Sequence, residues 1–409
     1  MSEFCLVRQP VFAATGALMG YEIRYSDSDD GQQAFTQSLL SGTFDLVRGP
    51  QPAFVACSRT QLLDNAFQVI DPASAILLLP PNMTDDPDIV AAIEKYCESG
   101  GRVALDGLTE AESPSESLLR FATWARIDVF AHDELTAARV CARITSLNSG
   151  LRLMAHHIHD LAHYEVALQL GVHGFQGSFF SRPEPVSSAE LPASTVSVMR
   201  LMGLARDPNV NDRQLEDVLA TDPVLTFQLL RLVNSASVGM RGVSSIGQAL
   251  RLIGRSAFQR WLAIAVAASR KSRTGADQEL VRQAVERGRL LEQLQGTSRE
   301  PGTLFLVGLF SLLDAVFRMS LPEILERVAL SDEASTALLD RMGPYADALA
   351  FAESYELGMF ESAAQIAGDM GIDSFKIGEL YTNALSWTND ALGTMLEEQP
   401  AAKPAKVGR

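Results

Sequence analysis

Histidine is concentrated in one short segment of this sequence. Four of the six histidines, His156, His157, His159 and His163, fall within LRLMAHHIHDLAH, at a predicted strand and just after it. Imidazole nitrogens at neighbouring positions can bind a transition metal such as zinc or nickel. On a strand, however, His157 and His159 share one face while His156 points to the other, and His163 falls on the next predicted helix. The spacing therefore favours polar, partly exposed side chains without a metal; a site built from His156, His157 and His159 is the alternative.

The cysteines and the apolar runs indicate a cytoplasmic protein. Cys5, Cys57, Cys97 and Cys141 are scattered without a CxxC spacing. This pattern predicts buried thiols in a reducing compartment, not a disulfide framework or a zinc knuckle. The most apolar run, WLAIAVAA at 261–268, is too short to cross a bilayer, and no leader pattern opens the chain. We therefore expect a soluble, cytoplasmic protein without a membrane partner.

The charge balance is acidic, with a net charge of −16 and a pI near 4.9. Such a chain is not expected to bind nucleic acid, because neutralising phosphates requires an excess of lysine and arginine. Basic residues do predominate between Arg231 and Arg289. They are either a solvated face that pairs with the acidic first half, which the overall charge favours, or a patch for an anionic partner. The candidate patch consists of Arg251, Arg255, Arg270, Lys271 and Arg273.

Short apolar runs alternate with helical patterns over the first 180 or so residues. Helical periodicity is found at 33–46, 89–99, 115–125 and 160–170. A hairpin followed by repeated strand and helix units predicts a modified (β/α) barrel, whose functional residues lie where strands end. The eight candidate strands are CLVRQP, ALMGYEIRYS, FVACS, AILLLP, RVALDG, RIDVF, LRLMAHH and GFQGSF.

The second half is predicted to be almost wholly helical, after a short linker rich in proline and serine. A short linker favours two domains that pack against each other. The central predicted helix begins with Asp222 as its cap and Pro223 as its first residue, and ends near Asn234 and Ser235. The next helix is expected to stop at Gly254. DQELVRQAVERGRLLEQLQ predicts an exposed charged helix, and GTLFLVGLFSLLDAVFRM a buried one.

Four linked motifs, DPNV, LEDVLATDPVL, LLRLVNSA and IGQALRLIG, resemble the HDOD domain over roughly residues 190 to 390. The signature residues are Asp222, Pro223, Asn234, Ser235 and Gly254. The resemblance implies an all-helical signalling module related to the HD metal phosphohydrolases. Active HD enzymes carry a His-Asp pair where this chain has Ser311 and Leu312, and the second half contains no histidine. A histidine-dependent hydrolase is therefore excluded by composition.

RQPVFAATGALMGYEIRYS and GFQGSFFSRPEPV resemble the opening and closing segments of the EAL domain, the cyclic di-GMP phosphodiesterase barrel. The two resemblances together are typical of the bacterial EAL-HDOD (YuxH-like) signal transduction family. They imply a two-metal site for Mg²⁺ or Mn²⁺ held by carboxylates and an asparagine.

Most of the metal ligands implied by this resemblance are missing. Ala56-Cys57-Ser58 lacks the asparagine, AILLLP lacks carboxylates, and a single acid stands in Asp106-Gly107. Arg126 replaces a lysine, and arginine does not readily give up a proton. A phosphodiesterase is therefore not expected; the remaining polar residues either satisfy hydrogen bonds at the barrel mouth or line a pocket. The vestigial EAL site comprises Glu22, Ser58, Asp106, Arg126, Asp128 and Gln176.

These patterns predict an EAL-like barrel at 1–185, a linker at 186–195, an HDOD domain at 196–395 and a disordered tail at 396–409. The expected function is non-catalytic signal transduction through protein partners, without a cofactor. A cyclic di-GMP receptor or residual phosphodiesterase is the alternative. The sequence leaves the partner and the oligomeric state open.

Overall fold

The structure is a computed structural model of the 409-residue chain. It describes residues 5–26, 31–80, 83, 86–108, 116–131, 133–148, 150–182, 193–234, 243, 245–269, 274–294, 302–328 and 330–396. Within these ranges, no helix has the length and apolar character needed to cross a membrane.

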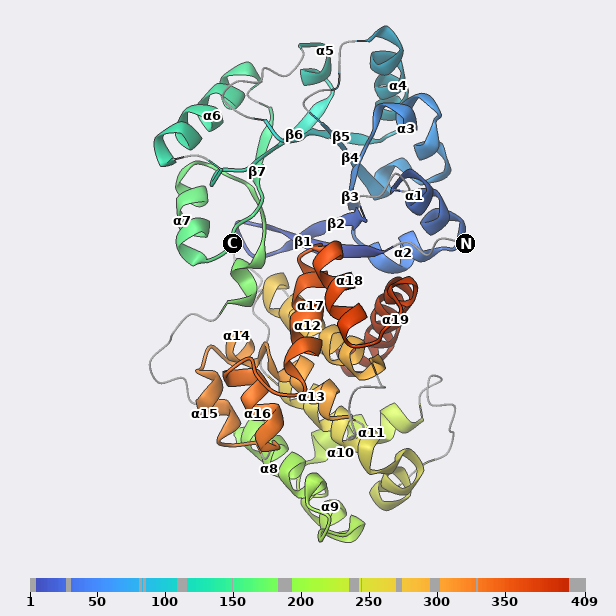
Figure 1. The fold of residues 1–409 in the computed structure, drawn as a ribbon, viewed down its shortest axis with the longest axis vertical. Coiled ribbons are helices and arrows are strands. Elements are labelled where there is room, and N and C mark those ends of the chain that lie inside the picture. The colour runs from blue at the N-terminus through green and yellow to red at the C-terminus, as the bar shows by residue number, and fades with distance from the viewer. Residues whose placement is uncertain are drawn as a thin grey trace, which may run out of the picture.

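The N-terminal part is a closed eight-stranded barrel, which confirms the predicted fold class (Figure 1). The first strand runs antiparallel to both of its neighbours, and the other neighbouring strands are parallel. The strands are β1 Leu6–Ala13, β2 Leu18–Tyr25, β3 Ala53–Ala56, β4 Ala75–Leu79, β5 Arg102–Leu105, β6 Ala122–Ile127, β7 Arg152–Ala155 and β8 Gly174–Gln176. The helices around them are α1 Gly31–Leu40, α2 Thr43–Arg48, α3 Arg59–Leu63, α4 Pro87–Glu98, α5 Glu116–Leu119, α6 Glu134–Leu147 and α7 Leu161–Gln169, with short turns η1 Ala66–Val69, η2 Pro72–Ser74 and η3 Ser178–Ser181.

The sixth strand lies earlier in the sequence than predicted. A helix was expected over 115–125 and a strand over RIDVF, but α5 ends at Leu119 and β6 already begins at Ala122. The side chain of Trp124 explains the difference, because it packs inside the barrel with Val11 and Met154. Large apolar side chains from alternate strand positions fill a barrel interior in this way.

The C-terminal part is helical, as predicted, and lies beside β1 and β2 (Figure 1). Its helices are α8 Ala193–Arg206, α9 Asp212–Leu219, α10 Pro223–Val233, α11 Ile246–Ala268, α12 Gly275–Gln293, α13 Thr303–Phe310, α14 Leu313–Phe317, α15 Leu321–Leu325, α16 Asp332–Leu339, α17 Ala346–Glu356, α18 Phe360–Asp369 and α19 Ile377–Leu396, with the turn η4 Ser374–Lys376.

The predicted caps of α10 and the break in α11 are present. The carboxylate of Asp222 accepts hydrogen bonds from the backbone N–H groups of Val224 and Leu225, 3.0 and 3.1 Å away, and Pro223 begins the helix. Asn234 ends it, and its side chain bonds both the N–H and the carbonyl of Val243. Gly254 has a φ of 74° and interrupts the helical backbone of α11, as the predicted stop requires. Ser235 lies outside the described residues.

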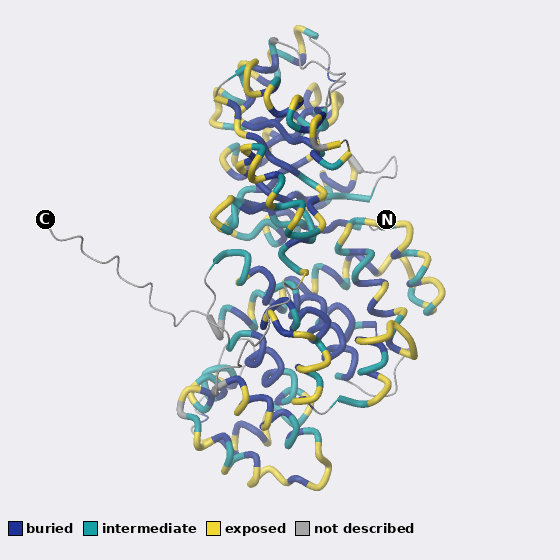
Figure 2. Tube along the Cα trace, turned by 90° about the vertical axis from the view of Figure 1, so that its left-hand side faces the viewer, coloured by how far each residue is buried: buried dark blue, intermediate teal, exposed yellow. Residues whose placement is uncertain are grey.

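The prediction that α12 is an exposed helix was wrong. Glu279, Glu286, Arg287 and Glu292 are buried on it, and α12 packs against α13, α19 and the strands β1 and β2. The outer face of these strands is covered by α12 and α17 of the helical part, so buried residues continue across the waist of the molecule (Figure 2). The helical part thus supplies the outer layer that this side of the barrel lacks.

Candidate functional site

A buried arginine joins two carboxylates at the carboxyl ends of the barrel strands. One nitrogen of Arg126 lies 2.6 Å from Glu22 Oε1. Its Nε and Nη2 donate to the two oxygens of Asp106, at 2.5 and 2.6 Å. The amide nitrogen of Gln176 donates to the other oxygen of Glu22 and, at 3.2 Å, to Gln9 Oε1. The structure thus brings four predicted residues, Glu22, Asp106, Arg126 and Gln176, into one network.

The charges of this network are mutually stabilised despite burial. The side chains of Glu22 and Arg126 are each only 9% exposed. Burial opposes ionisation of Glu22, but the positive charge of Arg126 and the bond from Gln176 outweigh it and lower the pKa of the carboxyl. The fork of an arginine matches a carboxylate in two parallel bonds, as seen with Asp106. A metal ion between Glu22 and Asp106 would have to displace this guanidinium.

The other positions at which the resemblance implies metal ligands carry apolar groups or serve the fold. Ala56 of β3 pairs with Leu78 of β4, so two methyl-bearing side chains lie next to each other. The thiol of Cys57 is buried, and burial raises its pKa. Ser58 is the N-cap of α3, and its hydroxyl accepts the N–H of Gln61 at 3.2 Å. Among the described residues at the ends of β3 and β4, Ala56, Cys57 and Leu78 offer none of the carboxylate or amide oxygens that suit Mg²⁺ or Mn²⁺.

Asp128 gathers two of the histidines. Its Oδ2 lies 2.8 Å from His157 Nδ1, and one possible ligand atom from each of Asp128, His156 and His157 lies within 4.8 Å of the other two. The strand alternation expected for these residues was wrong, because β7 ends at Ala155 and His157 has a φ of 59°, which turns its side chain back toward Asp128. His159 is not part of this group. Burial and the charge of Arg126 lower the pKa of His156 to about 4, so its ring is neutral at pH 7.

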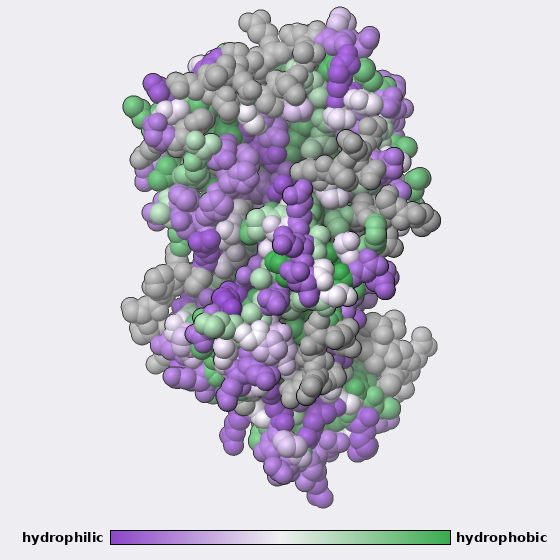
Figure 3. Space-filling model, viewed as in Figure 1, coloured by the Kyte–Doolittle hydropathy of each residue, from purple (hydrophilic) through white to green (hydrophobic). Residues whose placement is uncertain are grey.

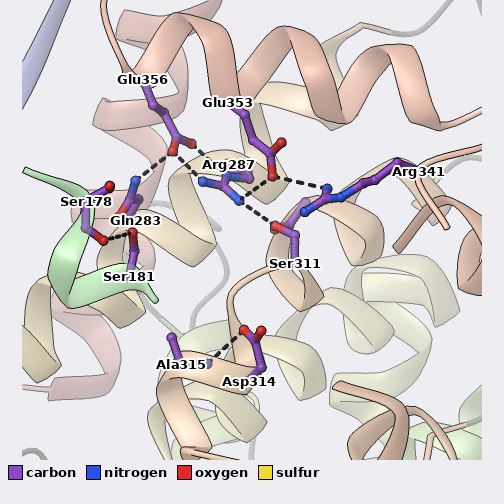
Figure 4. A network of polar contacts seen from close by, with 11 residues as sticks. Ser178, Ser181, Gln283, Arg287, Ser311, Asp314, Ala315, Arg341, Glu353 and Glu356 are labelled. Carbon is purple, nitrogen blue, oxygen red and sulfur yellow. Dashed lines mark hydrogen bonds and ion pairs between the residues drawn. The ribbon is translucent and has the colours of Figure 1, made fainter. Parts of the chain in front are cut away.

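The helical part also contains a buried arginine that is paired with a carboxylate (Figure 4). Arg287 of α12 donates to Glu356 through Nε, at 2.8 Å, and through Nη2, at 2.5 Å. Its Nη1 donates to the hydroxyl of Ser311 at 2.7 Å. Ser311 lies at the break between α13 and α14, where the resemblance implies the His-Asp pair of active enzymes. Burial raises the pKa of the neighbouring Asp314.

A cavity of about 820 Å³ connects the two arginine networks. The barrel contributes Glu22, Arg126, His156 and Gln176, and the helical part contributes Arg287, Ser311, Asp314 and Glu356. Between them, Arg8 of β1 forms a buried ion pair with Glu286 of α12 and lies over the Tyr21 ring. A molecule in this cavity would contact both domains.

The predicted basic patch is only partly described. Arg251 is exposed, whereas Arg255 donates to the carbonyls of Asp207 and Val210 and so holds the turn between α8 and α9. Arg270, Lys271 and Arg273 lie outside the described residues. Hydrophilic side chains cover the end of the molecule where α9 lies (Figure 3). The patch for an anionic partner therefore stays a prediction. The guanidinium of Arg255 serves the fold, because it bonds two backbone carbonyls.

Sequence reasoning missed Arg8, Glu286, Arg287 and Glu356. Their partners are far away in the sequence; Arg8 and Glu286 are 278 positions apart. The available signal was the number of charged residues on α12 beside its apolar ones, which was interpreted as a solvent-facing surface.

The chain folds into a closed barrel, in which β1 and β2 are antiparallel, followed by a helical part, and each part contains a buried arginine paired with carboxylates. The HDOD domain model matches residues 191–342. The chain therefore combines an EAL-like barrel with an HDOD domain, which confirms the resemblance drawn from the sequence.

Two relatives align along nearly the whole chain. The uncharacterized protein YuxH of Bacillus subtilis is 26% identical over 408 residues, covering 95% of this chain and 98% of YuxH. The cyclic di-GMP phosphodiesterase CdgJ of Vibrio cholerae is 25% identical over 405 residues, covering 94% of this chain and 92% of CdgJ. Among solved structures, the PaMucR phosphodiesterase in its c-di-GMP complex aligns with a TM-score of 0.38 and 19% identity, over 45% of this chain and 98% of that chain.

Proposed function

We propose that this chain is a bacterial signal transduction protein of cyclic di-GMP pathways that has lost catalysis and acts through protein partners. The observation that carries the proposal is the guanidinium of Arg126 between Glu22 and Asp106. A two-metal hydrolase needs those oxygens to hold the ions that activate water. Here they are already neutralised, and Ala56 and Leu78 supply no replacement ligands.

The helical part supports the same proposal. The pair needed for HD-type chemistry is replaced by Ser311 and Leu312, and Arg287 fills the space beside Ser311. Exposed apolar side chains on the neighbouring helices α10 and α11 offer a surface for a protein partner; they are Val224, Phe227 and Leu252. We place the domain boundaries of this proposal at 1–185 and 196–395, joined by a linker at 186–195.

A phosphodiesterase assay tests the loss of catalysis. Purified protein is incubated with cyclic di-GMP and Mg²⁺ or Mn²⁺, and the mixture is separated by chromatography. We expect no linear dinucleotide above a control without protein. Metal-dependent product formation that disappears in Glu22→Gln would overturn the proposal, because it would require Glu22 to act as a metal ligand.

A cyclic di-GMP receptor is the second candidate, and the cavity favours it. The cavity opens at the strand ends and is lined by Arg24 and Arg182 of the barrel, whose guanidinium groups can bind phosphate. Calorimetric titration with cyclic di-GMP distinguishes the two. Saturable binding without product, weakened by Arg24→Ala and Arg182→Ala, would make the barrel a sensor; absence of heat at high micromolar ligand would leave only the first candidate.

A further inference from the structure

We propose that Asp128, His156 and His157 bind one divalent transition metal ion, such as Zn²⁺, Ni²⁺ or Co²⁺. One ligand atom from each residue lies within 4.8 Å of the others. In a tetrahedral zinc site, with bonds of about 2.0–2.1 Å, neighbouring ligand atoms are separated by roughly 3.3 Å. His157 is more than half exposed, so its imidazole has space to move toward that geometry.

The carboxylate is already oriented as a ligand. Oδ1 of Asp128 accepts the backbone N–H groups of Phe130 and Ala131, each at 3.1 Å. These two bonds fix the carboxylate plane and leave Oδ2 directed at His157. Hydrogen bonds that orient a metal ligand in this way increase metal affinity.

His156 supplies a nitrogen that the protein itself does not use. Its Nε2 is buried and has no hydrogen-bond partner among the described residues. A buried polar atom without a partner is costly, and coordination of a metal ion removes that cost. The left-handed backbone at His157 also favours a shared metal ion. It brings the side chains of two consecutive residues, His156 and His157, to one point.

The surrounding charges suit a dication. Glu22, Asp106 and Asp128 contribute three negative charges and Arg126 one positive charge, which leaves a net charge of −2 around the site. Arg126 is held by its own two carboxylates, so it does not compete for Asp128. Nitrogen ligands and a single carboxylate select zinc, nickel or cobalt over Mg²⁺. This site shares Asp128 with the vestigial EAL site, but its two imidazole ligands and the metal that they select differ from the oxygen site that the EAL resemblance implies.

The position of the site indicates an open coordination sphere. His156 and His157 line the cavity between the domains. Three protein ligands leave at least one position for water or an incoming donor, as in zinc sites that are not purely structural. A metal ion here would provide an anchor for an anionic or nitrogen-containing ligand in contact with both domains.

Metal titration of variants tests the proposal. The protein is stripped with a chelator and titrated with Co²⁺ and Zn²⁺, following cobalt absorption and competition with a chromogenic chelator. We expect one equivalent to bind. His157→Ala and His156→Asn should each weaken binding at least tenfold, and Asp128→Asn should also weaken it.

His159→Ala and His163→Ala are matched controls, because both side chains are close in sequence but outside the group. They should bind metal as the unmodified protein does. Circular dichroism of each variant establishes that it is folded; His157→Ala is the safest of the three, given its exposure. Failure of the stripped protein to bind Co²⁺ or Zn²⁺ at micromolar concentrations would overturn the proposal. So would binding that survives His157→Ala and is lost in His159→Ala. Metal binding at this site does not require catalysis. Neither outcome of the metal titration therefore changes the result expected in the phosphodiesterase assay.

Discussion

Replacing Arg126 by methionine should expose the role of its guanidinium directly. The side chain makes two bonds to Asp106 and one to Glu22, and its loss leaves the buried Glu22 with the hydrogen bond from Gln176 and the more distant charge of Arg24. Removing one partner of a buried ion pair costs about 3–5 kcal/mol. Asp106 is 20% exposed and regains some hydration, so we expect a loss near the lower limit, about 3 kcal/mol in the free energy of unfolding.

The pH dependence of this loss has a definite sign. In the unmodified protein Arg126 lowers the pKa of Glu22, so the contribution of Glu22 is present above its unfolded pKa and is lost as the pH falls. Without the arginine, burial raises the pKa of Glu22 instead, and the variant loses stability as the pH rises. The difference between variant and unmodified protein should therefore be smaller at pH 5 than at pH 7.

Urea denaturation followed by circular dichroism measures both effects. Arg152→Met is the matched control, because Arg152 is exposed at the start of β7 and its guanidinium lies over the Trp124 ring, 5.6 Å from the ring centroid. It should cost less than about 1 kcal/mol. A second replacement, Glu22→Gln in the Arg126→Met background, should recover part of the loss. A loss of stability in Arg126→Met no greater than that of the control, or a loss that is equal at both pH values, would refute this role of the guanidinium.

Three further predictions concern burial, backbone geometry and pH. Burial, opposed by Arg8, raises the pKa of Glu286 to about 7. The free energy of unfolding should therefore fall by up to about 3 kcal/mol from pH 4.5 to 7. Urea titrations should show that Glu286→Gln removes this dependence on pH. Leu229→Asp should unfold the HDOD domain, because it buries an unpaired charge at a cost above about 4 kcal/mol. Phe227→Asp, on the exposed face of the same helix, should leave the thermal transition nearly unchanged. Equal effects of the two variants would mean that the helix register is wrong. Gly177→Ala would place a methyl group 2.0 Å from the Ile158 carbonyl oxygen and should prevent soluble expression. Gly171→Ala meets no neighbouring atom and should cost about 1 kcal/mol for its left-handed backbone. Comparable yields of the two variants would contradict the clash at Gly177.

The sequence was sufficient to predict the architecture because local patterns determine it. Strand alternation places Glu22 and Gln176 inside the barrel, and the Asp222-Pro223 start defines α10. The predictions failed where a non-local contact decides the local structure. Trp124 lies in a strand because the barrel interior accepts its ring, and α12 is buried because its charges pair with residues of β1 and α17.

The candidate site was predictable in composition but not in arrangement. The loss of the asparagine at Ala56 and of the carboxylates in AILLLP is visible in the sequence. The bonds from Arg126 to both Glu22 and Asp106 are not, because they depend on the placement of three strands. The approach of His157 to Asp128 depends on a positive φ at a residue other than glycine, which no sequence pattern indicates.

The most direct test is turnover of cyclic di-GMP by the purified 409-residue chain in the presence of Mg²⁺ or Mn²⁺. The structure predicts no linear product, because the guanidinium of Arg126 already occupies the space between Glu22 and Asp106. Product that depends on the metal and is lost in Glu22→Gln would contradict that prediction and show that Arg126 yields its place to metal ions.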